Sequence, residues 1–236
     1  TSPLAGGLPA ITIKRVGDGV VSRHLHEQVH AGDTLTVLDP TGDFTLEADP
    51  AASRHVVMIA GGVGITPLMS LAETVLRAAP GSRVVLLCGN RSENEIIFGQ
   101  RIAKLAAEFA PRLVVRHALD AAPEGWVGLH GALDGSLVLQ ALEGRAADAY
   151  YVCGPEPMMR SVCEALAASG VASDRIRTER FAYASAATTR IPDHAAEITF
   201  GRSGRRVTAR AGQTILQAGL AAGLDPNQST IFLQSQ

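Results

Sequence analysis

The segment 55–70 constrains the fold of this chain more than any other part of the sequence. An apolar, β-branched run at 56–60 is followed by Gly61-Gly62-Val63-Gly64 and then by an amphipathic stretch. This order is typical of a buried strand that leads into a helix whose N-terminus can hold a phosphate. Gly62 and Gly64 let a ligand approach the main chain, Thr66 offers a hydroxyl, and Pro67 suits a first helical turn. Alternatively, a single glycine-rich loop of this kind is only a tight turn.

Strand-like and helix-like segments alternate from residue 54 onward, which is typical of a parallel sheet with covering helices. We predict strands at 56–60, 83–88, 113–117, 149–153 and 176–181, and helices at 67–78, 96–110, 135–142 and 156–169. The pattern predicts an α/β nucleotide-binding domain over residues 51–181, with a parallel sheet and helices on both faces.

The two flanking regions have different patterns. Residues 1–50 contain short alternating runs that predict antiparallel strands at 10–16, 34–38 and 44–46, with a short helix at 21–29 for which Ser22 is a plausible cap. Residues 182–196 are rich in Ala and Thr without a period, and we interpret them as a linker. Residues 197–236 are a separate segment, with a predicted hairpin at 197–200 and 205–210 and a helix at 214–222.

Composition and charge limit the classes of partner and the kinds of site that this chain is expected to have. A net charge of -2 gives no reason to expect nucleic acid or an anionic membrane as a partner. The longest apolar run is far shorter than the ~20 residues of a membrane helix, and no signal peptide is visible. Three cysteines fit no metal or disulfide pattern, and His24, His26 and His30 are interpreted as solvated residues, so no metal site and a cytoplasmic location are predicted.

Open parallel sheets bind ligands at the carboxyl ends of their strands. One predicted strand is followed there by Asn90, Arg91 and Ser92. In dinucleotide-binding folds an acid at this point selects NAD, whereas a guanidinium with a hydroxyl suits the 2′-phosphate of NADPH. Alternatively, Arg91 is a solvated turn residue beside Glu93. We predict a preference for NADPH.

Two further strand ends carry candidate residues. The strand at 149–153 ends in Cys153-Gly154-Pro155, with Met158 one turn later. A thiol beside such a turn could lie against a nicotinamide ring, although a plain strand-to-helix corner with Met158 in the core is the alternative. The last predicted strand ends with Glu179 and Phe181, which by themselves indicate no function.

The order and spacing of these motifs resemble the ferredoxin–NADP reductase superfamily, and in particular the reductase components of multicomponent oxygenases such as phenylacetyl-CoA epoxidase and ketosteroid hydroxylase. The motifs are Gly-Gly-x-Gly-Ile-Thr-Pro, Gly-Asn-Arg-Ser, Cys-Gly-Pro-x-x-Met-Met and Glu-Arg-Phe. The resemblance implies that Gly62, Gly64 and Thr66 hold a pyrophosphate. It also implies that Cys153 and Gly154 flank the nicotinamide, with Glu179 and Phe181 near the edge of a flavin.

The resemblance extends to both flanks. Residues 1–50 resemble part of an antiparallel flavin-binding β-barrel, in which Gly19, Val20, Val21 and Ser22 would contact the FAD pyrophosphate. Residues 197–236 resemble the opening of a plant-type ferredoxin domain, an α+β fold of the β-grasp type. The family's Arg-x-Tyr-Ser flavin motif would precede Ser2, and its [2Fe–2S] cysteines would follow Pro226, where residues 227–236 contain none. We therefore expect a chain truncated at both ends that cannot hold the cluster.

By this resemblance the chain is expected to be an NADPH-dependent flavin oxidoreductase. Hydride would pass from NADPH to FAD, and single electrons would continue to an oxygenase component or a ferredoxin. Two alternatives stay open. One is a cluster-free diaphorase or free-flavin reductase, and the other is a nucleotide-binding fragment without activity.

Overall fold

The computed structural model describes residues 10–37, 42–47, 49–181, 194–200, 204–224 and 231–232. The chain divides into two compact units, Thr1–Phe181 and Ala182–Gln236. Within the described residues, no helix has the length and apolar character needed to cross a bilayer.

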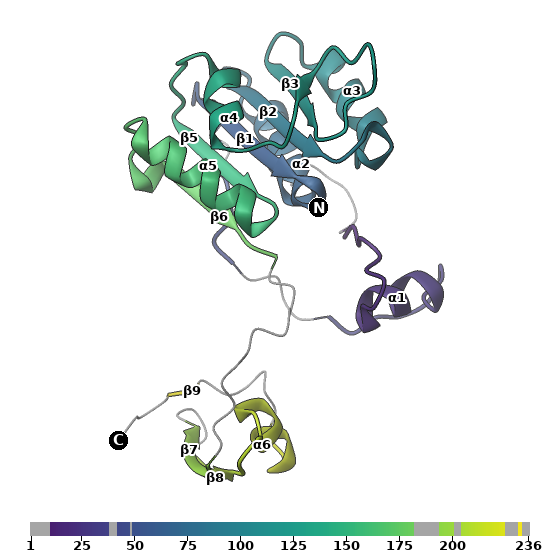
Figure 1. The fold of residues 1–236 in the computed structure, drawn as a ribbon, viewed down its shortest axis with the longest axis vertical. Helices are drawn as coiled ribbons and strands as arrows, with labels where there is room; N and C mark the ends of the chain where they lie inside the picture. Colours follow the sequence, from purple (N-terminus) through teal and green to yellow (C-terminus); the bar gives the residue numbers. More distant parts are fainter. Residues whose placement is uncertain are drawn as a thin grey trace. The chain divides into compact units, whose positions relative to one another are not determined.

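The larger unit is built on a six-stranded sheet in which every neighbouring pair is parallel (Figure 1). Its strands are β1 (His55–Gly61), β2 (Arg83–Asn90), β3 (Leu113–Leu119), β4 (Leu129–His130), β5 (Ala149–Cys153) and β6 (Ile176–Glu179). The spatial order is β4-β3-β2-β1-β5-β6. The chain therefore winds outward from β1 to β4 and returns to the other side of β1, which places the topological switch point between β1 and β5.

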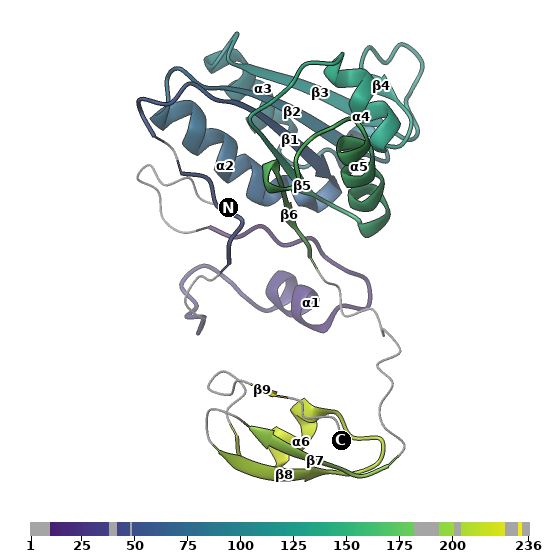
Figure 2. The same ribbon diagram turned by 90° about the vertical axis from the view of Figure 1, so that its left-hand side faces the viewer.

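Helices cover both faces of this sheet, and Figure 2 shows α2 on the face opposite to α4 and α5. The helices are α2 (Ile65–Ala78), α3 (Gly99–Glu108), α4 (Gly135–Leu142) and α5 (Glu156–Ala168). In β1, Met58 packs with the core under α2 and α3, and Val57 packs with the core under α4 and α5. A strand covered on both sides can be apolar throughout, which explains the unbroken run at 56–60.

The predicted strands and helices of this unit are present, two of them with the predicted bounds (135–142 and 149–153) and the others with ends shifted by one to three residues. The largest shift is at α3, which begins at Gly99 instead of 96, because Phe98 has a left-handed backbone (φ 61°) that ends the preceding turn. No sequence pattern indicated β4, whose two residues are too few to show an alternation.

The antiparallel strands predicted in the first 50 residues are not formed where the structure describes them. Residues 10–16, 34–37 and 44–46 have no strand, and the one regular element is α1 (Val20–Glu27). A strand needs a neighbouring strand to satisfy its backbone groups, and no partner is present among the described residues 10–47. Ile11 and Val37 accordingly stay 71% and 77% exposed. The cap was also wrong, since Gly19 is the N-cap of α1 and Ser22 lies inside the helix.

The smaller unit contains a three-stranded sheet in the order β8-β7-β9, with both pairs antiparallel. Its elements are β7 (Ala196–Phe200), β8 (Arg205–Ala209), α6 (Ile215–Ala221) and β9 (Ile231–Phe232). The predicted hairpin and helix are therefore present, and α6 begins with a capping box between Thr214 and Gln217. Most of the linker predicted at 182–196 lies outside the described residues. The likeness to a ferredoxin domain stays a prediction.

Candidate nucleotide-binding site

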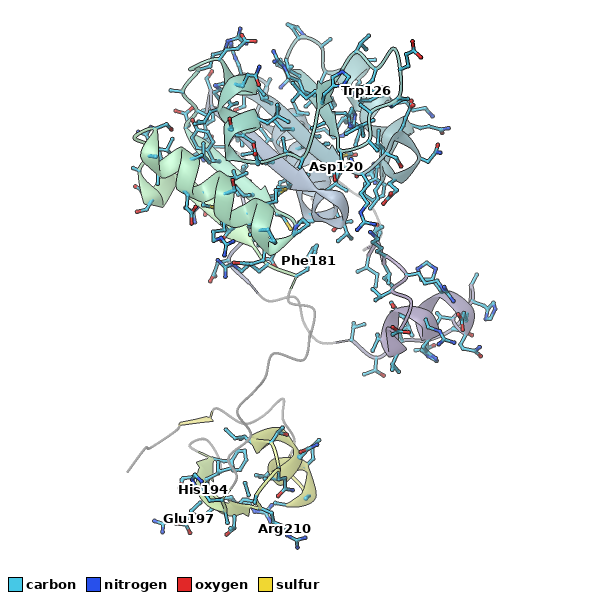
Figure 3. All side chains as sticks on the ribbon, viewed as in Figure 1. Asp120, Trp126, Phe181, His194, Glu197 and Arg210 are labelled. Carbon is cyan, nitrogen blue, oxygen red and sulfur yellow. The ribbon has the colours of Figure 1, made fainter. Side chains whose placement is uncertain are left out.

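A cleft of about 670 Å³ lies at the carboxyl edge of the parallel sheet, across the switch point. Its walls come from the turns that follow four strands: Gly62 after β1, Asn90 and Arg91 at β2, Asp120 after β3, and Pro155 after β5. Asp120 can be located in Figure 3. The topology alone brings these residues together, because they are distant in sequence and share one edge of the sheet.

The three glycines at the end of β1 and in the turn that follows it, Gly61, Gly62 and Gly64, meet different structural requirements. Only Gly62 has a positive φ (51°), and a Cβ there would meet nothing within 4 Å. Gly64 has an ordinary φ of -60°, but a Cβ on it would lie 2.0 Å from the carbonyl oxygen of Cys153. A Cβ on Gly61 would lie 2.6 Å from both Met158 Sδ and Pro155 Cδ. Two of the glycines therefore permit close packing of β1 and α2 on the turn after β5, and one permits the backbone turn itself.

The helix that follows this turn brings its N-terminus to the cleft. Gly62–Gly64 form a 3-10 turn that continues into α2, and Gly62 and Val63 line the cleft. The partial positive charge at such a helix start favours an anion. Thr66 is 4% exposed and its hydroxyl donates to the Val63 carbonyl at 3.0 Å, while Pro67 lies in the first turn of α2.

The turn after β2 is held by the turn after β3. The amide of Asp120 donates to the Asn90 carbonyl at 3.1 Å, and that of Ala121 donates to the Arg91 carbonyl at 2.8 Å. Arg91 is exposed and lines the cleft, whereas Ser92 does not line it. Glu95 and Asp120 line the same cleft, so its charge is mixed.

The turn after β5 forms the other wall. Cys153 is completely buried, and burial, together with the nearby Glu179 carboxylate, raises the pKa of its thiol to about 12. The thiol is therefore neutral at ordinary pH. A Cβ on Gly154 would lie 2.7 Å from Met158 Cε and 2.9 Å from Gly61 Cα, and Pro155 and Met158 line the cleft directly.

Several predicted residues do not line this cleft. Glu179 pairs in register with Cys153, but it lines a separate cleft of about 450 Å³ together with Asp43 and Phe44. Phe181 is 40% exposed and follows the end of β6 (Figure 3).

The residues predicted for the flavin pyrophosphate, Gly19, Val20, Val21 and Ser22, lie at the start of α1. The Ser22 hydroxyl accepts from the Val16 amide at 3.1 Å and donates to the Gly19 carbonyl at 3.4 Å. None of these four residues lines the main cleft.

Some residues that line the cleft were missed from the sequence. They are Asp120, Asn94, Glu95, Ile96, Ile97, Ala132, Leu133 and, from the N-terminal segment, Thr12, Ile13 and Lys14. Asp120 carried a usable signal, because it stands within three residues of the end of the strand predicted at 113–117, much as Asn90 stands two residues after the strand predicted at 83–88. Leu133 carried none, since its place depends on the short strand β4.

Comparisons with known proteins show which proteins this chain is similar to. Residues 58–164 match the family described as oxidoreductase NAD-binding domain. The ferredoxin reductase component of 3-ketosteroid-9-alpha-monooxygenase from Mycobacterium tuberculosis is 34% identical over 184 residues, which are 77% of this chain and 48% of that protein. One of the subunits of 1,2-phenylacetyl-CoA epoxidase from Escherichia coli is 29% identical over 226 residues, which are 92% of this chain and 64% of that protein.

A crystal structure of a cytochrome P450 reductase from Amycolatopsis has the same fold, with a TM-score of 0.65 and 27% identity, over 73% of this chain and 52% of that one. The chain thus spans about half to two thirds of the length of these proteins. The family match at 58–164 includes β2 to β5 and the turns that carry Gly62, Arg91, Asp120 and Pro155. The chain therefore contains an oxidoreductase NAD-binding domain and belongs to the ferredoxin–NADP reductase superfamily.

Proposed function

We propose that this chain is the NADPH-binding part of a flavin-dependent electron-transfer reductase that serves an oxygenase component or a ferredoxin. The observation that carries the proposal is the cleft at the switch point, which has a glycine turn on one wall and Arg91 on another. The names of the relatives, a ferredoxin reductase component and part of an epoxidase, support the electron-transfer role.

In this proposal the pyrophosphate lies against Gly62 and Gly64 at the start of α2, beside Thr66 and Pro67. Arg91, with Asn90 and Ser92, holds the 2′-phosphate. The carboxylates of Glu95 and Asp120 on the same cleft suit ribose hydroxyls and repel a phosphate. Discrimination between NADPH and NADH therefore depends on the Arg91 guanidinium.

The nicotinamide end is formed by the turn after β5. Cys153, Gly154, Pro155 and Met158 position the ring and exclude water from it, and the neutral thiol of Cys153 takes no part in proton transfer. When bound, a flavin supplies the conversion of a two-electron hydride into single electrons. The described residues 10–37 contain α1 and no strand. Contacts of Gly19, Val20, Val21 and Ser22 with the flavin pyrophosphate belong to the proposal alone. Roles for Glu179 and Phe181 at a flavin edge belong to the proposal alone.

Arg91→Ala tests the nucleotide preference. A charge-assisted hydrogen bond is worth about 1.5–3 kcal/mol, so the Kd for NADP+ should rise roughly 10- to 150-fold, while the Kd for NAD+ rises less than about threefold. Arg83→Ala is the matched control, because Arg83 is also exposed but stands at the opposite end of β2. Isothermal titration with both nucleotides measures the difference. Equal losses for NADP+ and NAD+ would contradict the assignment of Arg91.

A cluster-free diaphorase or flavin reductase is the second candidate. Residues 182–236 contain no cysteine, so these residues by themselves supply none of the four thiolate ligands that a [2Fe–2S] cluster needs. Absorbance spectra of the chain with added FAD and anaerobic NADPH separate the candidates. Bleaching with electron transfer to a ferredoxin supports the main proposal, and bleaching with transfer only to free flavin or dyes supports the second. If no flavin is retained although NADP+ binds, the chain acts as a nucleotide-binding fragment.

We also propose a cytoplasmic location. Cys88, Cys153 and Cys163 are all free thiols, and two of them are buried. Unpaired thiols are typical of a reducing compartment.

A further inference from the structure

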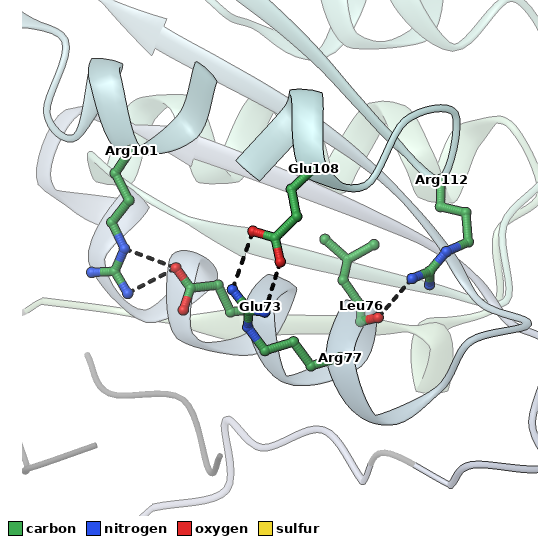
Figure 4. Close-up of polar contacts among 6 residues, drawn as sticks. All are labelled: Glu73, Leu76, Arg77, Arg101, Glu108 and Arg112. Carbon is green, nitrogen blue, oxygen red and sulfur yellow. Dashed lines mark hydrogen bonds and ion pairs between the residues drawn. The ribbon is translucent and has the colours of Figure 1, made fainter. Parts of the chain in front are cut away.

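Glu73 on α2 is the one charged residue that is buried among the residues that the structure describes, with 6% of its surface exposed. A buried carboxylate needs a partner, and Arg101 on α3 provides it. Nε and Nη2 of Arg101 each lie 2.8 Å from Glu73 Oε1 (Figure 4). The pair therefore joins the two helices that cover one face of the sheet.

Arg101 also contacts the start of its own helix. Its Cζ lies 5.8 Å from the centre of the Phe98 ring, and Phe98 is the N-cap of α3 with the left-handed φ of 61°. The Phe98 carbonyl accepts the first helical bond from the Ile102 amide at 2.8 Å. A bulky residue keeps this backbone conformation only where its surroundings fix it, and the guanidinium stacked on the ring is one such constraint.

Phe98 ends the segment 91–98, which leaves β2 and forms one wall of the cleft through Arg91, Glu95, Ile96 and Ile97. The facing wall is the glycine turn, from which α2 starts. Glu73 and Arg101 thus connect the helices that follow each wall, yet neither residue lines the cleft.

We infer that Glu73 and Arg101 are positioning residues that hold the 91–98 wall at a fixed place relative to the glycine turn, and thereby set the affinity of the cleft for its nucleotide. This inference rests on the proposed function for the identity of the ligand. The physical argument is that a wall held by an ion pair to the buried Glu73 carboxylate and by a stacked ring is already ordered before a ligand binds, so binding costs less entropy.

The chain offers a closely matched control. Arg77 and Glu108 also join α2 to α3, at 2.8 Å, and the two arginines are about equally exposed (Figure 4). The control differs in its carboxylate, because Glu108 is exposed and is the last residue of α3, whereas Glu73 is buried. A general loss of contact between the helices would appear in Arg77→Gln as well as in Arg101→Gln. An effect through Phe98 would appear in Arg101→Gln alone.

The experiment measures the full 236-residue chain and its Arg101→Gln, Arg101→Lys and Arg77→Gln variants by two methods. Hydrogen exchange without ligand should become faster in residues 91–102 of both Arg101 variants and stay unchanged there in Arg77→Gln. Titration with NADP+ should give a Kd raised about five- to tenfold in Arg101→Gln, less in Arg101→Lys, which keeps the charge, and less than about twofold in Arg77→Gln.

Glu73→Gln should reproduce Arg101→Gln, and if it does not fold, Arg101→Lys still decides the question. Unchanged exchange at 91–102 in the Arg101 variants overturns the inference, as does an equal change in Arg77→Gln. If the exchange results are as expected but the unaltered chain binds no NADP+, the proposed function fails. The claim that Glu73 and Arg101 set the nucleotide affinity is then overturned as well. If NADP+ binds the Arg101→Gln chain as tightly as the unaltered one, the inference alone fails.

Discussion

Replacing Gly64 by alanine tests whether the cleft depends on close contact between the glycine turn and the end of β5. The added Cβ would lie 2.0 Å from the carbonyl oxygen and 2.4 Å from the carbonyl carbon of Cys153. Both atoms belong to the backbone of a buried central strand, so no side chain can move aside. The start of α2 must therefore shift by roughly 1.5 Å relative to β5 to restore an ordinary contact of about 3.5 Å.

The expected cost is at the upper end of the range for overpacked sites, about 3 kcal/mol. For a unit of this size, each kcal/mol lowers the unfolding temperature by about 2–4 °C, so Gly64→Ala should unfold roughly 6–12 °C earlier. NADP+ affinity should fall with it, because the shift moves the same turn that lines the cleft.

Thermal unfolding followed by circular dichroism measures the change, and two glycine variants serve as controls. Gly99→Ala places a Cβ 3.4 Å from Ile96 Cγ2, an ordinary contact, at the start of α3, and should be neutral or slightly stabilising. Gly62→Ala meets no atom within 4 Å but has to adopt a positive φ, so it should cost about 1 kcal/mol. A Gly64→Ala chain that unfolds within about 1 °C of the unaltered one would refute the argument from close packing.

Two further predictions concern titrating groups. Burial lowers the pKa of His117 from its usual 6.5, and its Nδ1 is buried without a hydrogen-bond partner, so the unfolded chain binds a proton more readily than the folded one. The free energy of unfolding should therefore fall as the pH drops below about 6.5. Urea unfolding at about pH 7.5 and at about pH 5 measures this fall, which should be smaller in His117→Leu than in the unaltered chain. An equal fall in the two chains would argue against this role of His117. Burial raises the pKa of Cys88 and Cys153 to about 12, so a thiol reagent at about pH 7.5 should modify partly exposed Cys163 slowly and the other two only after denaturation; rapid reaction of Cys153 in the folded chain would contradict its burial.

The sequence alone predicted the α/β unit and most of its elements, because local patterns report on local structure. The apolar run at 56–60 indicated a buried strand, and the glycine turn indicated the start of a helix. Strand ends were also enough to place Gly62, Asn90, Arg91, Pro155 and Met158 on one edge of the sheet, where all five line the cleft.

Tertiary structure decided the rest, since it depends on partners distant in sequence. The strands predicted at 10–16, 34–38 and 44–46 have suitable patterns, but a strand forms only beside another strand, and no such partner is present among the described residues of the segment 10–47. The need for a glycine at position 64 cannot be found from the sequence either. A Cβ there would collide with the carbonyl oxygen of Cys153, which is distant in sequence and belongs to β5. The Glu73–Arg101 pair could not be found from spacing either, since the two side chains meet only when α2 and α3 pack on the same face of the sheet.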